Sequence, residues 1–374
     1  MLQIRSFEAS GYRSLRRVAI ETGNLTVLAG HNGAGKSNLY RALQLVQAAA
    51  SGTLAREIAA EGGMQSAFWA GRRSANQPVR IALAVELASP DKAGVYRYDI
   101  EVGLPRSTDA AFALEPQIKD EALSFVLRNR RRPLLKRRGP LLLAWDVDGE
   151  EHEIAHGLLA SETGLSAVEA APAFPDVHLV RRTLTDWRFY HELRTDTGSA
   201  LRAPALGVTT PTLASDGRDL AAVFATLAHI RGDTTDLQAA VEDAFPGAWL
   251  DIPRVADVAR FGLTSPDFRT DGGAPRVFAA SELSDGTLRY LALVGALLAY
   301  RLPAFIALNE PESSLHPGLV PPLARLIARA AERTQVWVVT HSDPLARELE
   351  ALGADHLRVV KTDGATSIVG RDEA

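Results

Sequence analysis

The sequence of 374 residues contains no cysteine, and this absence excludes three kinds of chemistry. Without cysteine the chain can form no disulfide framework, no thiolate nucleophile and no cysteine-ligated zinc site. A cysteine-free chain suits the reducing cytoplasm, which is where we expect the protein to act.

Long hydrophobic segments are also missing. The N-terminus, MLQIRSFEAS, lacks the extended apolar core of a secretory signal peptide. The longest apolar run, Leu291–Tyr300, is too short to span a bilayer and is flanked by Arg289 and Arg301. We therefore expect this run to form a buried helix, and we expect no membrane association.

The chain has no excess of positive charge and no repeated pattern. Its formal net charge of −4 argues against a wholly basic nucleic-acid-binding surface, although a local basic patch remains open. No segment sustains the heptads of a coiled coil, and there is no internal repeat or low-complexity tract. A hydrophobic content of 46% and a charged content of 23% are those of an ordinary globular protein.

The most informative stretch that is present is Gly30–Ser37, GHNGAGKS, which fits the phosphate-loop pattern G-x-x-x-x-G-K-[ST]. A short apolar run, Leu25–Ala29, precedes it, and the helix-forming segment Asn38–Ala50 follows it. A phosphate loop needs this order of strand, glycine-rich turn and helix. We therefore expect the protein to bind a nucleoside triphosphate.

Each part of this motif has a physical role. The glycines let successive backbone N–H groups point inward around the phosphates, and the following helix adds its positive N-terminal end. Lys36 adds a point charge, and the Ser37 hydroxyl reaches Mg²⁺. The residues of the loop that we expect to bind ATP are Gly30, Asn32, Gly33, Gly35, Lys36, Ser37 and Asn38.

The hydrophobic patterns predict a mixed α/β core with an inserted lobe. Residues 79–155 predict an antiparallel sheet, and residues 160–245 predict helices at 174–190, 217–230 and 234–245. In the C-terminal third, strands at 304–308, 335–340 and 356–361 alternate with helices at 287–300, 319–332 and 344–352. Such alternation predicts a parallel sheet. We assign residues 1–50 and 271–374 to a nucleotide-binding core and residues 51–270 to the inserted lobe.

Two of these buried strands end in polar residues. The strand at 304–308 is followed by Asn309 and Glu310, and the strand at 335–340 is followed by His341. Ligands of parallel sheets bind at the carboxyl ends of strands, so a carboxylate there can activate a water molecule for phosphoryl transfer. Alone, Glu310 would be read as a helix-start carboxylate and His341 as a core histidine. Together with a phosphate loop, they favour a catalytic role.

The ordered set of motifs resembles the ATP-binding-cassette ATPases of the SMC, Rad50 and RecF kind, most closely a stand-alone RecF-like head without a coiled coil. Gly30–Ser37 matches the Walker A motif, and Phe305–Glu310 resembles the Walker B motif with its catalytic glutamate. Leu283–Thr287 resembles the LSGGQ signature, Ser313–His316 stands in the place of the D-loop, and His341 matches the switch histidine. The middle of the chain matches the family only loosely.

This resemblance implies a P-loop NTPase fold and a mechanism. Two heads would pair head to tail, with each ATP lying between one subunit's Walker A motif and the other's signature, where Ser284 and Gly286 would complete the partner's site. Glu310 would act as the base, and His341 would sense the γ-phosphate. Ser37 and Asn309 would hold Mg²⁺. Hydrolysis of ATP would then release the dimer.

The sequence departs from the family pattern at Asn309, where the family usually has aspartate. Asparagine keeps an acceptor oxygen but loses the charge that a hard divalent cation prefers, which favours a slow, switch-like ATPase. The glutamine that should contact Mg²⁺ from the lobe is not assigned, with Gln65 and Gln77 as alternatives.

The segment His152–His156 fits H-E-x-x-H, the zinc-protease pattern. On a helix, histidines four residues apart lie about 6 Å apart along the axis and can share one zinc ion. This segment follows a strand and a turn and precedes Gly157. On a strand, the same spacing separates the histidines by about 13 Å, so we do not expect a protease.

The densest positive run is a candidate for phosphate contact with DNA, because the lobes of the family engage DNA. The alternative is a solvated hairpin connection, since the run contains no aromatic residues to stack on bases. The residues of this run are Arg128, Arg130, Arg131, Arg132, Lys136, Arg137 and Arg138.

Two biological roles stay open. The first is an ATP-hydrolysing head that acts in DNA repair or maintenance, as the resemblance suggests. The second is a regulatory switch whose ATP-driven dimerisation controls a separate effector protein, of the phage-defence type. We expect any effector to be another chain, because no nuclease domain follows the last residue.

Overall fold

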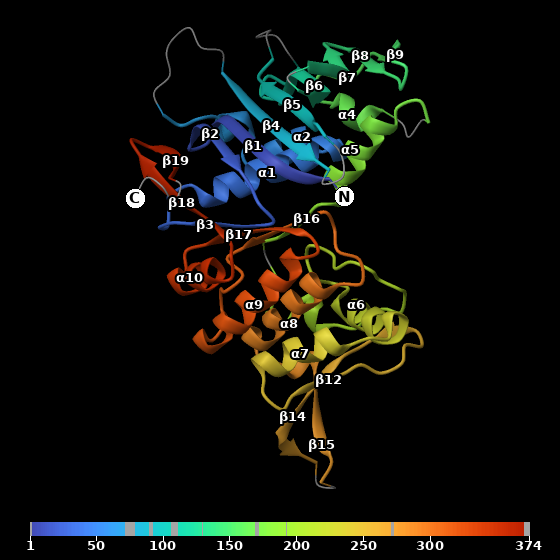
Figure 1. The fold of residues 1–374 in the computed structure, drawn as a ribbon, viewed down its shortest axis with the longest axis vertical. Helices are drawn as coiled ribbons and strands as arrows, with labels where there is room; N and C mark the ends of the chain where they lie inside the picture. The colour runs from blue at the N-terminus through green and yellow to red at the C-terminus, as the bar shows by residue number, and fades with distance from the viewer. Residues whose placement is uncertain are drawn as a thin grey trace. The chain divides into compact units, whose positions relative to one another are not determined.

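A computed structural model of the protein describes residues 2–71, 79–89, 93–105, 111–128, 130–168, 172–191, 193–270 and 273–369 (Figure 1). The chain forms two compact units. Unit 1 contains residues 1–23, 28–187 and 357–374, and unit 2 contains residues 24–27 and 188–356. Within the described ranges, no helix has the length and apolar character needed to cross a membrane.

Unit 1 is built around an antiparallel sheet of eight strands (Figure 1). In sheet order the strands are β2 (Leu15–Glu21), β1 (Gln3–Tyr12), β4 (Arg80–Ala88), β5 (Val95–Gly103), β6 (Gln117–Leu127), β7 (Arg130–Arg138), β8 (Leu141–Trp145) and β9 (Glu151–His156). The antiparallel sheet predicted from residues 79–155 is therefore present as β4 to β9. The pairing of β1 with β4 adds the N-terminal hairpin to the same sheet, which the sequence analysis did not predict.

The helices of unit 1 pack on this sheet. They are α1 (Lys36–Ser51), α2 (Leu54–Ala60), α3 (Gly63–Ala67), α4 (Gly164–Ala167) and α5 (Pro175–Asp186). Helix α1 packs against β1 and β4, and α4 and α5 pack against β7. Helix α1 ends at Gly52, whose φ of 77° is the left-handed conformation that favours glycine at a helix end.

Besides the eight-stranded sheet, each unit contains a further set of paired strands. In unit 2 its order is β10 (Arg188–Tyr190), β16 (Phe305–Asn309), β17 (Gln335–Thr340) and the start of β3 (Leu25–Ala29). In unit 1 its order is the end of β3, then β18 (Asp355–Thr362) and β19 (Ala365–Val369). Every residue of β3, β16 and β17 is buried, as expected for apolar parallel strands. Strand β19, which pairs antiparallel with β18, was not predicted.

The predicted helix over residues 174–190 is wrong in its last turn. Helix α5 ends at Asp186, and residues 188–190 form β10, which pairs in parallel with β16. Trp187 adopts an extended conformation between them, and its carbonyl accepts a hydrogen bond of 2.7 Å from Gln47. The strand pairing overrides the helical spacing, because aromatic residues fit either structure and the sheet decides between them.

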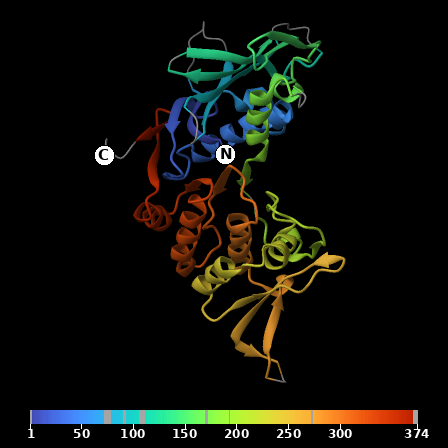
Figure 2. The ribbon, with the colours of Figure 1, turned by 45° about the vertical axis from the view of Figure 1, so that its right-hand side comes forward.

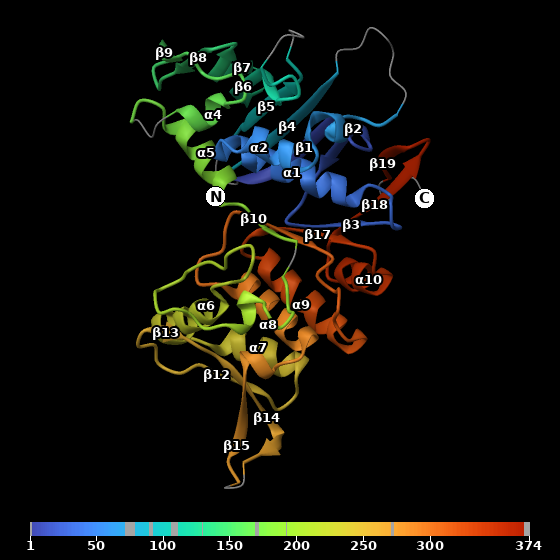
Figure 3. The same cartoon turned by 180° about the vertical axis from the view of Figure 1, so that it is seen from behind.

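The helices of unit 2 follow the predicted order (Figure 3). They are α6 (Leu220–Thr226), α7 (Thr235–Ala244), α8 (Asp285–Leu298), α9 (Val320–Ala331) and α10 (Asp343–Ala351), with η2 (Leu227–Arg231), a π-helix, continuing α6. Three 3₁₀ turns are η1 (Ala200–Arg202), η3 (Ala280–Glu282) and η4 (Pro317–Leu319). Helix α8 contains residues 291–298 of the predicted buried run, and its residues from Tyr290 to Leu298 are buried. The end of that run is different from the prediction, since Tyr300 lies after the helix and is 42% exposed.

Short antiparallel sheets complete unit 2. One sheet has the order β12 (Trp249–Asp251), β14 (Gly262–Arg269) and β15 (Pro275–Ala279), and the other pairs β11 (Ala205–Leu206) with β13 (Val258–Ala259). Figure 2 shows β14 and β15, in orange, as a hairpin that extends away from the helices of this unit. The chain leaves this hairpin through η3 and enters α8.

Candidate nucleotide-binding and catalytic residues

The phosphate loop of unit 1 lies between β3 and α1, as the motif predicts. Lys36 is the first residue of α1 and is only 5% exposed. Its Nζ atom donates hydrogen bonds to the carbonyl oxygens of Gly30, at 2.5 Å, and of His31, at 3.0 Å. The ammonium group is therefore held inside the curl of the loop, where a bound phosphate would need it.

Two glycines of the loop are required by close packing. A Cβ atom on Gly30 would lie 2.2 Å from the carbonyl oxygen of Val359, and one on Gly35 would lie 1.9 Å from Oγ1 of Thr366. Gly35 also has a φ of 105°. By contrast, a Cβ atom on Gly33 would meet no atom within 4 Å, although its φ is 79°. The fold therefore excludes a side chain at Gly30 and Gly35 for steric reasons.

Ser14 and Thr366, which the sequence analysis missed, form hydrogen bonds beside the phosphate loop. The Ser14 and Thr366 hydroxyls are buried and lie 2.7 Å apart, and Thr366 donates a hydrogen bond of 2.8 Å to the carbonyl of Ala34. Asn38, predicted to bind nucleotide, directs its Nδ2 atom to the Ser14 hydroxyl at 2.7 Å. Ser14 and Thr366 come from a turn and from the unpredicted β19, so no local pattern marks them.

The start of α1 is suited to an anion. Among the described residues no side chain caps this helix, and its first turn contains no acidic residue. Asn32, Gly33 and Ser37 are exposed around it. The positive end of the helix dipole is a usual basis of phosphate binding, so these residues fit the triphosphate.

In unit 2, the two predicted catalytic residues are in contact. Glu310 follows β16 and His341 follows β17, and His341 Nδ1 lies 3.2 Å from Glu310 Oε1. The backbone N–H of Glu310 donates a 2.7 Å hydrogen bond to the carbonyl of Val339 on β17. Glu310 has a φ of 47°, in the left-handed region that non-glycine residues rarely adopt. Such backbone strain is typical of functional sites, and here it accompanies the turn of the carboxylate towards His341.

Asn309 has a partner that was not predicted. Its Nδ2 atom lies 2.8 Å from Nδ1 of His191, the residue directly after β10. Three neighbouring strand ends thus carry His191, Asn309 and His341. His191 was not predicted, because the hydrophobic spacing predicts a helix over residues 188–190. Asn309 is 7% exposed, and its Oδ1 atom is buried with no hydrogen-bond partner in the described residues. An orphaned acceptor oxygen fits Mg²⁺ or its bound water, although asparagine lacks the charge of aspartate.

Arg289 connects the signature helix α8 to the Glu310 segment. Its Nη2 atom donates a 3.1 Å hydrogen bond to the carbonyl oxygen of Glu310. Burial lowers the pKa of this guanidinium, while the nearby carboxylates of Glu312 and Glu310 act in the opposite direction. Glu312 accepts a hydrogen bond from the Thr340 hydroxyl, which ties the residues after β16 to the end of β17.

The signature-like segment begins α8. Ser284 is the N-cap of this helix, and its hydroxyl accepts a 3.2 Å hydrogen bond from the N–H of Thr287. Asp285 pairs with Arg202 at 2.7 Å, which fixes the first turn. A Cβ atom on Gly286 would lie 2.9 Å from the carbonyl oxygen of Ser314, so the D-loop segment packs directly on this glycine. Ser284 is exposed and open to a ligand.

Of the two alternative lobe glutamines, Gln65 lies exposed on α3. Gln77 lies outside the described residues.

The arginine run lies on strand β7 and on the turn before it, whereas the alternative interpretation placed it in a hairpin connection. Arg137 is buried and donates hydrogen bonds of 2.8 Å to the carbonyl oxygens of Gly139 and Leu159. The Arg137 side chain therefore stabilises the fold and is not accessible for contact with DNA. Arg132 pairs with Asp176 at 2.8 Å. The exposed members of the run are Arg128, Arg130, Arg131, Arg132 and Arg138.

Solved structures of the same fold are ATPase heads. The SMC head bound to the C-winged helix domain of ScpA has a TM-score of 0.57 with 15% sequence identity, covering 99% of this chain and 98% of that chain. The SMC head with an extended coiled coil from Pyrococcus furiosus, bound to the C-terminal domain of ScpA, has a TM-score of 0.54 with 14% identity and covers 99% and 96% of the two chains. At these identities the likeness concerns the fold, which is that of a P-loop ATPase head of the SMC type.

The family follows from the sequence itself. Residues 25–347 match the family described as "AAA domain, putative AbiEii toxin, Type IV TA system". This match covers most of the chain, and the protein belongs to this family. Among curated proteins, none matches the sequence.

Proposed function

We propose that this protein binds and hydrolyses ATP and that two copies pair around the nucleotide. The observation that carries the proposal is the contact of 3.2 Å between His341 and Glu310. It occurs in a chain whose phosphate loop already holds Lys36 against its own carbonyls. Nucleotide hydrolysis needs groups that hold the phosphates and a residue that orients or activates the attacking water, and these residues are suited to those roles.

In the phosphate loop, Lys36 would transfer its hydrogen bonds from the loop carbonyls to the phosphates of ATP. The N-terminus of α1 would favour the same negative charge. Ser37, which is exposed, and Asn309 are the residues that would hold Mg²⁺. When bound, Mg²⁺ neutralises charge on the β- and γ-phosphates.

Glu310 would accept a proton from the attacking water. A general base must lie within hydrogen-bond reach of the proton that it takes, and a fixed orientation of its carboxylate favours this. His341 contacts one carboxylate oxygen, Oε1, and leaves Oε2 for water. His341 itself would respond to the γ-phosphate and so report whether ATP or ADP is bound.

Pairing of two copies would use the signature segment. Ser284 and Gly286 stand at the N-terminus of α8, and Ser284 is exposed. We propose that they bind the γ-phosphate of the second copy's ATP, where a helix N-terminus and a hydroxyl stabilise negative charge. Hydrolysis would remove this phosphate and separate the copies.

Two biological roles follow from different observations. A role in DNA maintenance or repair is supported by the exposed arginines around β7, among them Arg128, Arg130 and Arg138. A role as a switch for a separate effector protein is favoured by the family description, which names a toxin and a toxin–antitoxin system. The SMC head bound to a ScpA domain shows that a head of this fold can hold a protein partner.

The experiment that tests the activity and separates these roles is steady-state ATP turnover with Mg²⁺ during a titration of double-stranded DNA. Lys36→Ala serves as the blank. Turnover that rises with DNA, and rises less in an Arg128→Ala/Arg130→Ala variant, supports the DNA role. Turnover that is indifferent to DNA favours the effector switch. No turnover above the Lys36→Ala blank would contradict the proposed ATPase activity.

A further inference from the structure

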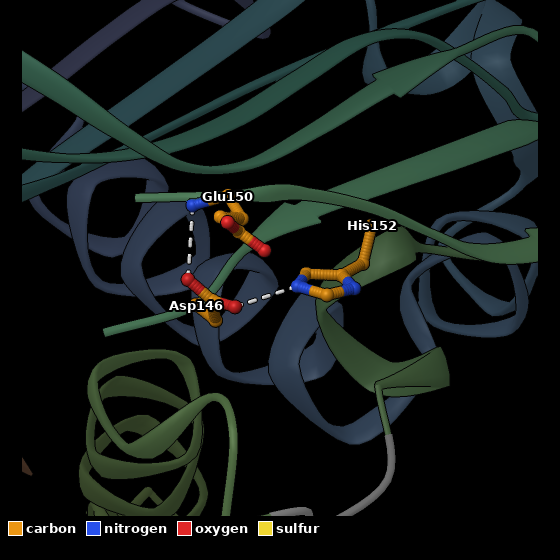
Figure 4. Close-up of side chains that lie close together, drawn as sticks. All are labelled: Asp146, Glu150 and His152. Carbon is orange, nitrogen blue, oxygen red and sulfur yellow. Dashed lines mark hydrogen bonds and ion pairs between the residues drawn. The ribbon is translucent and has the colours of Figure 1, made fainter. Parts of the chain in front are cut away.

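The turn between β8 and β9 in unit 1 brings three side chains together that the nucleotide chemistry does not use. Figure 4 shows the carboxylates of Asp146 and Glu150 and the imidazole of His152 directed towards a common centre. One oxygen of each carboxylate and one ring nitrogen of His152 all lie within 4.8 Å of one another. Imidazole nitrogen and carboxylate oxygen are ligand atoms for divalent metal ions.

The backbone and a neighbouring aromatic ring hold two of these side chains in place. Asp146 Oδ1 accepts hydrogen bonds from the backbone N–H groups of Asp148, at 3.0 Å, and Glu150, at 2.9 Å. This leaves Asp146 Oδ2 for His152, whose Nε2 atom lies 2.6 Å away. The His152 ring packs at 5.8 Å, edge to face, against Phe174, which is buried. Two of the three ligand groups, those of Asp146 and His152, are therefore held in a fixed orientation.

The charges around the turn favour a cation. No described residue forms a hydrogen bond or ion pair with the Glu150 carboxylate, although it stands close to that of Asp146. Asp146 has His152 as an ion-pair partner when that ring is protonated, so a bound metal ion would take the place of this pairing. The surrounding sequence adds to the negative potential, since residues 146–153 include Asp148, Glu151 and Glu153 and no lysine or arginine.

In this cluster, His152 of the H-E-x-x-H segment acts without the second histidine that the zinc-protease pattern requires. The segment lies on strand β9 and not on a helix, and residues four positions apart on a strand are separated by about 13 Å. His152 instead meets residues of the turn that precedes it. A ligand set of this kind is formed by the hairpin and cannot be read from a motif.

We propose that Asp146, Glu150 and His152 form a binding site for a divalent first-row transition-metal ion such as Zn²⁺. One nitrogen and two oxygens suit Zn²⁺ or Mn²⁺, whereas Ca²⁺ and Mg²⁺ prefer oxygen ligands alone. Three protein ligands leave a coordination position for water. The ion would tie the β8–β9 turn together beside Phe174, and it would stabilise the folded protein by binding it in preference to the unfolded chain.

The test is isothermal titration of ZnCl₂ into tag-free, EDTA-treated, nucleotide-free protein, with optical titration of Co²⁺ as a second probe. The wild type should bind one ion at this site. Glu150→Gln and His152→Gln should each weaken Zn²⁺ binding by about tenfold or more. CaCl₂ titrated in the same way should bind more weakly than Zn²⁺.

Matched controls separate this site from other histidines and carboxylates. Glu151→Gln removes the same charge from the next, exposed residue and should bind Zn²⁺ like the wild type. His341→Ala removes the histidine beside Glu310 and should also leave this ion in place. Because Glu150 is exposed, Glu150→Gln should fold even if His152→Gln does not. No Zn²⁺ binding by the wild type, or equal binding by the Glu150→Gln and Glu151→Gln variants, would overturn the proposal. Lys36→Ala should lose ATPase activity and still bind Zn²⁺ at this site. The metal-site proposal and the ATPase proposal can therefore fail separately.

Discussion

His341 and Glu310 stand at the ends of adjacent parallel strands with their side chains 3.2 Å apart. The register of β16 and β17 sets this contact, because Asn309 pairs with Val339 and each strand then runs on by one or two residues before its polar side chain. Glu310 enters the left-handed region at this point. The sheet therefore fixes a carboxylate and an imidazole as a pair, and the proposed ATPase mechanism rests on them.

Asn309→Asp should lower the Mg²⁺ concentration needed for half-maximal ATP turnover. Aspartate restores the charge that a hard cation prefers, at a position whose acceptor oxygen has no partner in the described part of the chain. We expect a change of roughly tenfold, the effect of about 1.4 kcal/mol of additional binding. The measurement is ATP turnover against Mg²⁺ concentration. The variant should also unfold more readily than the wild type, because position 309 is buried. If the dependence of ATP turnover on Mg²⁺ concentration is unchanged, Asn309 is not a ligand of Mg²⁺.

Gly35→Ala should abolish ATP binding, whereas Gly33→Ala should retain a folded protein with weakened binding at most. Both positions have positive φ, which costs a residue with a Cβ atom about 1–2 kcal/mol. Only at Gly35 would that atom also collide with Thr366 Oγ1. Binding of a fluorescent ATP analogue and thermal unfolding of the two variants check this. Equal behaviour of the pair would show that strain, and not the collision, dominates.

Arg289→Met should reduce the maximal rate of ATP turnover by about tenfold and change the KM for ATP by less than about twofold. Arg289 contacts the Glu310 carbonyl and is a positioning residue, so its loss should affect the carboxylate more than the phosphate loop. Arg289→Lys should recover part of the rate. Arg347→Met, an exposed arginine on α10, is the matched control and should have normal kinetics. A change confined to KM would contradict the positioning role.

Glu121→Gln should destabilise unit 1 by about 1–3 kcal/mol, the usual effect of mispaired buried polar groups. The buried Glu121 carboxylate accepts hydrogen bonds from the Tyr98 hydroxyl at 2.9 Å and from the N–H groups of Gly164, at 2.6 Å, and Leu165, at 2.8 Å. A glutamine would turn an NH₂ group towards one of these donors. Urea unfolding measures the change, with the exposed Glu151→Gln as a control that should stay within experimental error of the wild type.

The phosphate loop and the polar strand ends could be predicted from the sequence because each depends on local order. An apolar strand followed by glycines and a helix specifies the surroundings of Lys36 without distant contacts. The same holds for Glu310 and His341, which directly follow fully buried strands. The sequence therefore predicted a P-loop ATPase fold, and the similarity to the SMC head confirms this fold class.

The missed residues depend on pairings between distant segments. Ser14 and Thr366 are 352 positions apart, and they meet only because β19 folds back on β18 next to the phosphate loop. His191 was hidden because Arg188–Tyr190 reads as the end of a helix until β16 pairs with it. Arg137 reads as part of an exposed basic run, whereas in the structure it is buried and binds the carbonyls of Gly139 and Leu159, both of which follow it in the chain.

The most direct test of the account compares the wild type, Lys36→Ala and Glu310→Gln for ATP binding, ATP turnover and mass in solution. Glu310→Gln should bind ATP like the wild type, lose turnover by about 10²-fold or more, and accumulate as a dimer in the presence of ATP and Mg²⁺. Lys36→Ala should neither bind ATP nor dimerise. If Glu310→Gln hydrolyses ATP at the rate of the wild type, Glu310 is not the base and the proposed mechanism is wrong.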